Sequence, residues 1–424
     1  MAAAPSPKRP LPDYDGRGNY EADADHWALW IPRGLLGPLY VVHEYVVRRP
    51  IGALVTVAER DRWINAISEL FTFGPNQEFM LIPTVVYDFG FRTNAGLRFT
   101  ADHFLVHNHD FVAHAATGGT DWWIASVRDR YRWNDGNTAV ATHLDYVRRP
   151  DLAFMGTGPE VRDDARTRYG LQKLIAGAWF THRGDRYQIV GEAGVRHLGF
   201  RASTCCDDPD LGEQVRAGAI DAPGYGTTYT VADQSLAITL DSRQPRPAPG
   251  TGARLSTYVT TSFDPGHDRS WVKYGGAVGA AVDLTGRQRT LYLQLAADFV
   301  DPMQGEGNEI PFTDLVSMTD HDQMQGFTGG WMIGRSTIAT ELGYTWPVAF
   351  MLDGNVRLAV GNAFGARLDG MAADKLRLSG DVGITTIGAR DSGFELIVGV
   401  GSAPFDQGFH LDTVRLAVGS RRGI

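Results

Sequence analysis

The sequence predicts an all-β fold, a sixteen-stranded antiparallel transmembrane β-barrel that follows a short N-terminal α-helical segment. Three observations predict this fold. The chain is rich in glycine and aromatic residues, its apolar residues alternate with a period of two from about residue 75 to the end, and long connections alternate with short ones. These features are typical of strands that cross a membrane and close on themselves.

The composition suits many strands joined by tight turns. The 424 residues include 50 glycines, 11% are aromatic and only 21% are charged. A helical protein would lose about 1 kcal/mol for each glycine inside a helix. No run of about 18 apolar residues occurs, so a transmembrane helix is not predicted, whereas a barrel strand needs only about 9 to 11 alternating residues to cross.

Charge and cysteine usage restrict the partners and the compartment. The formal net charge of -9 argues against a nucleic-acid partner, which normally needs a basic face. The two cysteines are the adjacent Cys205 and Cys206, which fits export through an oxidising compartment. A bond between neighbours closes a tiny strained ring, so we expect either two loop thiols or a local disulfide without a function.

Two segments are expected before the barrel. Residues 1–24 are rich in Pro, Asp and Gly and are predicted to form a flexible leader. Residues 25–74 are predicted to form amphipathic helices, because apolar residues recur at spacings of three and four. These helices either pack on the periplasmic mouth or the membrane interface, or plug the lumen. The start lacks the apolar core of an export signal, so we expect that a signal preceded Met1 and was removed.

Residues 75–424 are predicted to form the barrel, and each alternating stretch ends at Gly, Asn, Asp or Pro. The sixteen predicted strands span 79–91, 94–105, 108–118, 121–132, 136–148, 167–181, 185–200, 227–241, 252–263, 270–284, 287–300, 335–346, 349–362, 374–387, 392–402 and 410–420.

The alternation within a strand shows which solvent each face meets. In the strand 287–300, Leu293 and Leu295 share one face, whereas Gln294 and Asp298 share the other. One face suits lipid and the other suits a water-filled lumen. A soluble sandwich would also alternate, but sixteen strands would need a second core.

Connection lengths give an independent argument for a barrel. The long stretches 149–166, 201–226 and 301–334 follow odd-numbered strands, and the short stretches 131–137, 182–185 and 285–288 follow even-numbered ones. One longer turn, 242–251, departs mildly from this rule. Outer-membrane barrels have short periplasmic turns and longer outer loops, so both chain ends are expected on the periplasmic side.

Three short motifs occur in order along the predicted barrel. They are Asp241, Arg243 and Gly252 in a periplasmic turn, Met324, Gln325, Gly326 and Phe327 in the longest loop, and the strand segments within 342–365. They are similar to the Asp-x-Arg turn, the Val-Arg-Gly-Phe loop and the penultimate strand motifs of the BamA-type outer-membrane barrels, also called bacterial surface antigens. The second motif lies between predicted strands eleven and twelve, where that family has an inward-folded sixth outer loop.

The resemblance implies a latch whose charges are replaced in this chain. In the family, an arginine of the loop pairs with acidic residues on strands twelve and thirteen. Here Gln325 stands at the position of the arginine, Gly343 at that of a glutamate, and Ala359 at that of an aspartate that precedes Gly361. Losing all partners together avoids an unpaired buried charge, which would cost about 3 to 5 kcal/mol.

Two charged residues remain among these latch-facing strand positions. Glu341 and Arg357 face inward in the predicted alternation, and we expect them to pair across strands. The loop itself is expected to fold inward through Gln325 and Phe327.

The chain also departs from the family at its ends. About 78 residues precede the first strand and read as helices rather than as the family's periplasmic POTRA repeats, and the last strand does not end on an aromatic residue. The resemblance implies a monomeric barrel in the outer membrane of a Gram-negative-type cell, surrounded by outer-membrane lipids and lipopolysaccharide. It would assist assembly or translocation of proteins or lipids, with unfolded outer-membrane or secreted proteins as clients. The alternative is a passive or plugged channel, or a structural barrel, without insertase activity.

No pattern predicts an enzyme, a cofactor or a metal site. The glycines of 156–160 lack the following helix of a phosphate loop, and no nucleophile turn of the GxSxG type occurs. Four histidines lie close together in the sequence: His103, His107, His109 and His114. Two of them have a spacing that a metal could use, but they are explained as polar residues near a periplasmic turn. Residues 320–322, beside the inner-loop motif, are explained as part of a solvated loop. A lipid-hydrolysing barrel whose catalytic residues meet only in space stays open to an activity test on phospholipid micelles.

Overall fold

The structure is a computed structural model, and it describes residues 45, 50, 69–74, 78–244, 250–284, 286, 289–304, 310–318, 323–349, 352–386, 394–408 and 410–420. The leader predicted at 1–24, most of the helical segment predicted at 25–74 and the acidic segment 320–322 lie outside these residues. Within the described part of the helical segment, residues 69–71 are helical and Thr72–Phe73 form the short strand β1.

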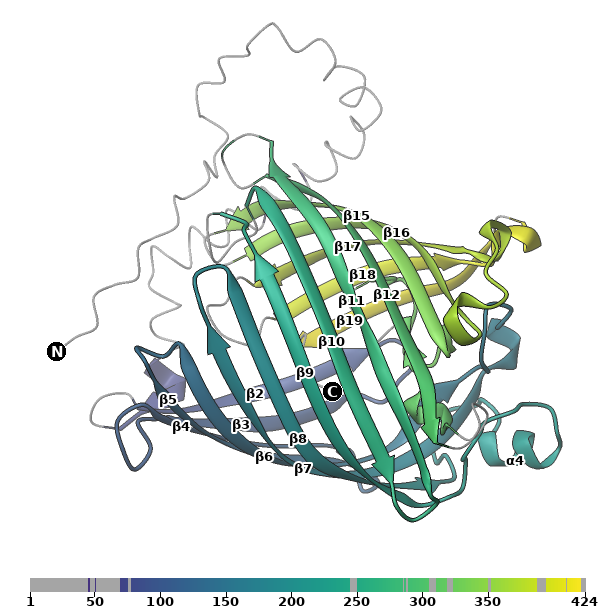
Figure 1. The fold of residues 1–424 in the computed structure, drawn as a ribbon, viewed down its shortest axis with the longest axis horizontal. Helices are drawn as coiled ribbons and strands as arrows, with labels where there is room; N and C mark the ends of the chain where they lie inside the picture. The colour runs from purple at the N-terminus through teal and green to yellow at the C-terminus, as the bar shows by residue number, and fades with distance from the viewer. Residues whose placement is uncertain are drawn as a thin grey trace, which may run out of the picture.

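All sixteen predicted strands are present. They are β2 (Phe79–Asp88), β3 (Asn94–Asp102), β4 (His109–Gly119), β5 (Trp122–Trp133), β6 (Thr138–Phe154), β7 (Thr167–Arg183), β8 (Tyr187–Arg201), β9 (Tyr229–Asp241), β10 (Gly252–Asp264), β11 (Arg269–Asp283), β12 (Thr290–Gln304), β15 (Ser336–Ala349), β16 (Leu352–Phe364), β17 (Arg377–Thr386), β18 (Phe394–Ser402) and β19 (Leu411–Ser420). Each pairs antiparallel with the next, and β19 pairs with β2, so the sheet closes into a barrel (Figure 1). The predicted fold class is confirmed.

Some strands run further than predicted at the end of the barrel that carries the long loops. The fifth strand was expected to end at residue 148, before Pro150, but β6 continues to Phe154. Its pairing with β7 shifts register between Arg149 and Leu152, so Pro150 lies in a bulge. No ladder hydrogen bond at a bulge requires the N–H that proline lacks. Long strands therefore project into the loop region.

The two faces of the sheet differ as the alternation predicts. On β12 the side chains of Leu293 and Leu295 are 55% and 43% exposed on the outer face, whereas Ala296 and Asp298 are 4% and 1% exposed on the inner face. The same outward exposure of aliphatic side chains recurs around the barrel, for example at Leu97, Leu144, Leu174, Val195, Leu240, Val278, Leu358, Val382 and Val398. A continuous aliphatic outer surface is suited to lipid.

Aromatic rings gather on the outer face near the short-turn end. The ring centroids of Phe79 and Phe99 are 6.0 Å apart, those of Phe99 and Phe111 are 6.4 Å apart, and those of Phe104 and Phe111 are 5.0 Å apart. Phe73 of β1 stacks on Phe79 at 5.7 Å. Such rings are typical of the membrane interface of outer-membrane barrels.

The long-loop end carries the remaining elements. These are the helix α4 (Leu211–Arg216), the hairpin of β13 (Val316–Ser317) and β14 (Ile333–Gly334), and the 3-10 helices η3 (Asp163–Ala165), η5 (Phe312–Asp314), η7 (Ala366–Leu368), η8 (Ala373–Lys375) and η9 (Phe405–Gln407). The helix α4 projects from this end in Figure 1 and is capped by the Asp210 carboxylate, which accepts from the Glu213 N–H. Cys205 and Cys206 are joined in a local disulfide in the same loop, one of the two expected alternatives. Among the described residues, no helix is long and apolar enough to span a membrane.

Candidate functional site: the strand seam and the inner loop

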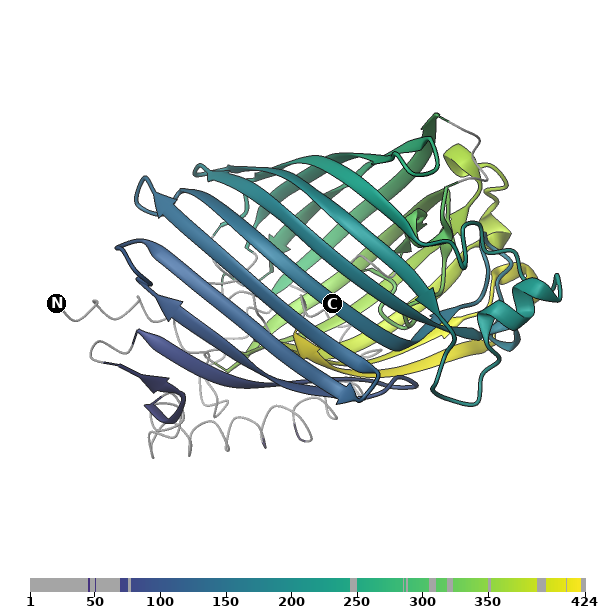
Figure 2. The same ribbon diagram turned by 90° about the horizontal axis from the view of Figure 1, so that it is seen from below.

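The seam, by which we mean the pairing of β19 with β2, is short. Ala417 pairs with Asp88 and Val418 with Tyr87, and these are the two residue pairs found among the described residues. One further backbone bond of 3.0 Å runs from the Phe89 N–H to the Leu416 carbonyl. By contrast, β18 and β19 pair along their whole length. Figure 2 shows the yellow β19 meeting the purple β2. Among the described residues, few backbone hydrogen bonds therefore hold the closure of the barrel.

One edge of β2 is open beyond the seam. Its other edge pairs with β3 from residue 79 to residue 86. At the open edge, β1 pairs with Phe79 and Met80, so among the described residues 81–86 lack a strand partner on that side. Pro83 lies in this stretch, and proline is tolerated in an edge strand because no ladder bond needs its N–H. Such an edge can accept an added strand.

An ion pair reinforces the seam from inside the lumen. The guanidinium of Arg415 on β19 donates from Nε to Asp88 Oδ1 at 3.0 Å and from Nη2 to Asp88 Oδ2 at 2.8 Å. Both side chains are largely buried, at 17% and 21% exposed. A bidentate pair of this kind is stronger and more directional than a single charged hydrogen bond.

The described parts of the inner loop, the segment of residues 305–335, fold into the long-loop mouth of the barrel. These parts, 310–318 and 323–335, belong to two clusters of buried apolar side chains. In the first cluster, Phe312 packs on Phe154 of β6 and Tyr169 of β7, with ring centroids 4.7 and 5.2 Å apart. The loop thus closes much of this mouth with a packed interior.

A buried carboxylate holds the first arm of the inner loop, by which we mean residues 310–318; the second arm is residues 323–335. Asp314, which is fully buried, accepts from Arg196 Nη2 at 2.7 Å and from the Tyr229 hydroxyl at 2.7 Å. Lys273 Nζ lies 3.7 Å from the same carboxylate. Burial alone would raise the pKa of Asp314, but Arg196 and Lys273 together hold this pKa below its ordinary value. Here the loop supplies the acid and the wall supplies the cations, the reverse of the arrangement implied by the family resemblance.

The predicted inner-loop motif forms the second arm. Met324 and Phe327 are 1% and 0% exposed, and the Gly326 N–H donates to Ser379 Oγ of β17 at 2.9 Å. A Cβ added to Gly326 would lie 2.0 Å from the Val400 carbonyl oxygen of β18, so only glycine allows this approach. Gln325, at the position of the family's arginine, lies beside β19, where its Oε1 accepts from Arg415 Nη1 at 3.1 Å.

The latch-facing positions Gly343 and Gly361 have no room for a side chain, because groups of the neighbouring strands lie close to them. A Cβ on Gly343 would lie 2.2 Å from the ring of Tyr292, and a Cβ on Gly361 would lie 2.5 Å from the Ile338 carbonyl oxygen. Ala359 is 2% exposed and belongs to the same apolar cluster as Met324 and Phe327. The loop therefore packs on this wall through apolar contacts, where the resemblance implies ion pairs.

The two charged latch-facing residues belong to a network in the wall. Glu341 accepts from the Tyr292 hydroxyl at 2.7 Å. Arg357 donates from Nε to Asp381 at 2.7 Å and from Nη2 to Glu395 at 3.2 Å. In the register of β15 and β16, Arg357 lies opposite Gly343 and Glu341 lies opposite Ala359. The ion pairs of Arg357 thus run toward β17 and β18, and its expected direct pair with Glu341 stays a prediction.

The predicted turn motif is brought together at the short-turn end. The Arg243 side chain donates from Nε to Asp241 Oδ1 at 2.9 Å and from Nη2 to Asp241 Oδ2 at 2.8 Å. Gly252 has a φ of 146°, and a Cβ there would lie 2.8 Å from the Arg243 backbone. This motif braces its own turn, so its described contacts are structural.

The four histidines singled out in the sequence each lie beside another side chain in the described structure. The rings of His103 and His107 stack at 4.4 Å, His109 pairs with Asp129, and His114 hydrogen-bonds to Thr84. Among the described residues, no group of three His, Cys, Asp or Glu side chains is placed to hold a metal ion.

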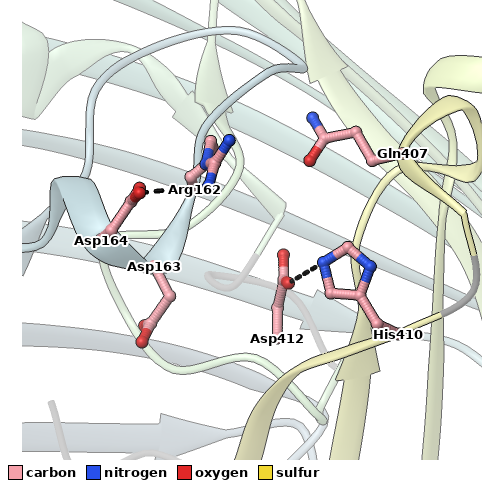
Figure 3. A pocket seen from close by; sticks show the side chains of 6 residues that line it. All are labelled: Arg162, Asp163, Asp164, Gln407, His410 and Asp412. Atoms are coloured by element: carbon pink, nitrogen blue, oxygen red, sulfur yellow. Dashed lines mark ion pairs between the residues drawn. The ribbon is translucent and has the colours of Figure 1, made fainter.

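A polar pocket lies between two loops at the long-loop end, lined by Arg162, Asp163, Asp164, Gln407, His410 and Asp412 (Figure 3). Its acids already have cations: Asp412 binds Arg377 and His410, and Asp164 binds Arg162. We therefore interpret the pocket as a contact between loops and not as a binding site.

Sequence reasoning missed the residues that join the seam and the inner loop. Asp88 and Arg415 are inward-facing charges on the first and last strands, which must be neighbours in any closed barrel, so their pairing could have been predicted from the alternation. Asp314 had a weaker signal, a single acid between apolar residues in the longest loop. Its partner Arg196 could not be predicted, because no periodicity places a loop against a particular strand.

The fold and the site define a class of protein: a closed sixteen-stranded antiparallel barrel with an inner loop and, among the described residues, a short seam. The crystal structure of BamA from Haemophilus ducreyi lacking POTRA domains 1-3 is similar, with a TM-score of 0.55, 13% identity, and coverage of 81% of this chain and 70% of that chain. CdiB from Acinetobacter baumannii aligns with a TM-score of 0.48, 10% identity, and coverage of 81% and 59%. CdiB from Escherichia coli aligns with a TM-score of 0.47, 12% identity, and coverage of 80% and 62%. The chain spans about six tenths of each CdiB chain.

No protein-family model matches the sequence, and no curated protein matches it significantly. At these identities the likeness to BamA is one of fold.

Proposed function

We propose that this chain is an integral outer-membrane barrel that assists the assembly or translocation of proteins or lipids. Its domains are then a leader at 1–24, helices at 25–74 and the barrel at 75–424. Its surroundings are outer-membrane lipids and lipopolysaccharide, its clients are unfolded outer-membrane or secreted proteins, and it acts as a monomer without a cofactor.

One observation carries this proposal: the seam is short and leaves an edge of β2 open. Among the described residues, 81–86 present backbone N–H and C=O groups without a strand partner on the seam side. Backbone polar groups inside a lipid bilayer must be satisfied, so an unpaired edge favours pairing with another strand. A strand of an incoming protein added to this edge would satisfy them, as in other cases of strand addition.

The test compares barrels with an open and a closed seam. Tyr87→Cys and Val418→Cys place a thiol pair across the seam, because these residues are register partners. The native Cys205 and Cys206 are replaced by serine in every variant. The rate at which a small unfolded outer-membrane barrel folds into phospholipid vesicles containing the protein is followed by gel mobility. We expect faster folding than in empty vesicles, loss of the acceleration on oxidation of the thiol pair, and recovery on reduction.

A matched control separates the seam from cross-linking as such. Leu255→Cys with Val278→Cys joins two register partners in a fully paired part of the wall, and both face outward. This pair should leave the acceleration unchanged when oxidised. Equal acceleration by the oxidised and reduced seam pair, or none by either, would contradict the proposed function.

A plugged channel is the second candidate, and the inner loop favours it. Phe312, Phe327 and Trp331 are 2%, 0% and 0% exposed in the long-loop mouth. The packing of these side chains argues against a wide passage at this end of the barrel. Deletion of residues 1–74, and separately of the inner-loop residues 310–334, followed by planar-bilayer conductance distinguishes the candidates. A large steady pore that appears on deletion favours the plugged channel, and unchanged low conductance favours the first proposal.

A further inference from the structure

The proposed function does not explain the contacts of the Nη1 atom of the Arg415 guanidinium. One edge of this planar group is bound to Asp88 across the seam, as described above. Its Nη1 atom points the other way and donates to Gln325 Oε1 at 3.1 Å and to the Phe327 carbonyl at 3.1 Å, with the Gln325 carbonyl at 3.4 Å. A single rigid side chain thus touches the first strand, the last strand and the inner loop.

The geometry of arginine makes this contact a coupling rather than two separate bonds. The guanidinium holds five donors in a fixed plane, so its two edges cannot be reoriented independently. If the loop tip withdraws, Nη1 loses its acceptors and the side chain is free to leave the orientation that Asp88 requires. A lysine at this position would keep a charge near Asp88 but could not present two fixed edges.

The loop tip is placed for such a role by two other contacts. The Thr413 hydroxyl, also on β19, donates to the Gly326 carbonyl at 2.7 Å, and the Gly326 N–H donates to Ser379 Oγ. The backbone of Gly326 lies directly on β18, since a Cβ on Gly399 would lie 2.9 Å from the Gly326 Cα. The tip therefore rests on the last three strands, next to the seam, and not on a distant part of the wall.

We propose that Arg415 couples the inner loop to the seam, so that the barrel opens between β19 and β2 when the tip formed by Met324, Gln325, Gly326 and Phe327 withdraws. This is a regulation of the seam and rests on the proposed function for its biological use. The coupling itself is a property of the barrel alone. Arg415, which provides the coupling, lies on the last strand, and the sequence alone predicts only that its charge faces inward.

The experiment measures seam closure directly and without a client. The full-length chain in vesicles carries Tyr87→Cys and Val418→Cys in the background that lacks the native cysteines, and the rate of disulfide formation under a fixed oxidant reports how often the seam is closed. Gly326→Val displaces the loop tip, because its Cβ would meet the Val400 carbonyl at 2.0 Å. We expect it to slow cross-linking about tenfold, the factor that loss of one charged hydrogen bond typically gives. Gly329→Val is the matched control, since a Cβ there meets open space, and it should have no effect.

The role of Arg415 is tested by combining substitutions. Arg415→Met alone should slow cross-linking, and adding Gly326→Val should slow it no further. Arg415→Lys should cross-link near the reference rate yet become insensitive to Gly326→Val, a result that a merely structural arginine would not give. Gln325→Ala, which leaves both backbone acceptors in place, should have a smaller effect than Gly326→Val and serves if the valine variant does not fold.

Two results would overturn the coupling: cross-linking that is unaffected by Gly326→Val in a folded barrel, or equal slowing by this substitution whether or not Arg415 is present. Gel mobility before and after heating checks that each barrel is folded. If the coupling is found but no client folds faster, the proposed function fails while the coupling stands.

Discussion

At the scale of single residues, charges inside this barrel are stable because strands bring their partners together. Arg357 on β16 is 4% exposed and lies between Asp381 on β17 and Glu395 on β18. A buried ion costs several kcal/mol to remove from water, and the attraction of well-placed partners offsets that cost. The cluster also ties three neighbouring strands to one another close to the seam, so it stabilises the wall on which the inner loop rests.

Replacing Arg357 tests this account. Arg357→Met leaves two acids facing each other without their cation, and we expect it to destabilise the barrel by about 3 to 5 kcal/mol. Asp381→Asn should cost less, because Arg357 keeps Glu395. Urea unfolding of the barrel in vesicles measures both. Arg201→Met, at an exposed arginine that binds Gln172, is the control and should change little; a similar loss in all three variants would refute the cluster's role.

The same scale shows what the sequence could and could not predict. The replaced positions Gln325, Gly343 and Ala359 were recognisable from their motifs, and the alternation placed Arg357 inside. The partners of Arg357 were not predictable, because side chains that face one lumen can pair with either neighbouring strand. The packing of Tyr292 over Gly343 was equally hidden, since a missing Cβ gives no signal in a pattern of polar and apolar residues.

At the scale of elements, the inner loop is attached to the barrel wall at two places in the long-loop mouth. Its first arm is bound to β8 and β11 through Asp314, and its second arm rests on β17, β18 and β19 through Gly326. The sequence predicted the loop's place between strands eleven and twelve, because its length stands out. It could not predict the internal hairpin of Val316–Ser317 with Ile333–Gly334, since two-residue strands leave no periodicity.

The first arm should be sensitive to acid. The pKa of Asp314 is held below its ordinary value of about 4, so its carboxylate form stabilises the docked loop. This stabilisation is full above the ordinary value and is lost as the pH falls through the lower folded value. We expect Asp314→Asn to lower stability at neutral pH by about 3 kcal/mol, because Arg196 is left with one acid fewer, and to flatten the loss of stability between neutral and strongly acidic pH.

Thermal unfolding in detergent across that pH range makes the measurement, with Asp369→Asn in the neighbouring outer loop as a control whose pH profile should follow the unsubstituted protein. An acid-induced loss that is equally steep with and without the Asp314 carboxylate would show that other groups cause it.

At the scale of the whole molecule, alternation predicted the strand number, and alternation together with the composition and the connection lengths predicted the closed barrel. Each strand was predicted from its own residues, and the antiparallel order followed from the short turns. The seam was the part that such reasoning could not reach. How many residues pair between β19 and β2 depends on the stagger accumulated around the entire barrel, and no local segment encodes it.

The assignment of the outer strand face to lipid and of the inner face to the lumen leads to a prediction for the whole barrel. Leu295 lies in the middle of the outer face of β12 and is 43% exposed, whereas its neighbour Gln294 faces the lumen opposite Glu341. If the outer face contacts lipid, Leu295→Arg should destabilise the barrel in vesicles by about 2 to 4 kcal/mol, the cost of a cation near the middle of a bilayer. Gln294→Arg introduces the same side chain one residue away, into a wet lumen and beside a carboxylate, and should cost much less. Urea unfolding in vesicles measures the difference, and an equal cost for the two arginines would contradict a membrane-embedded barrel.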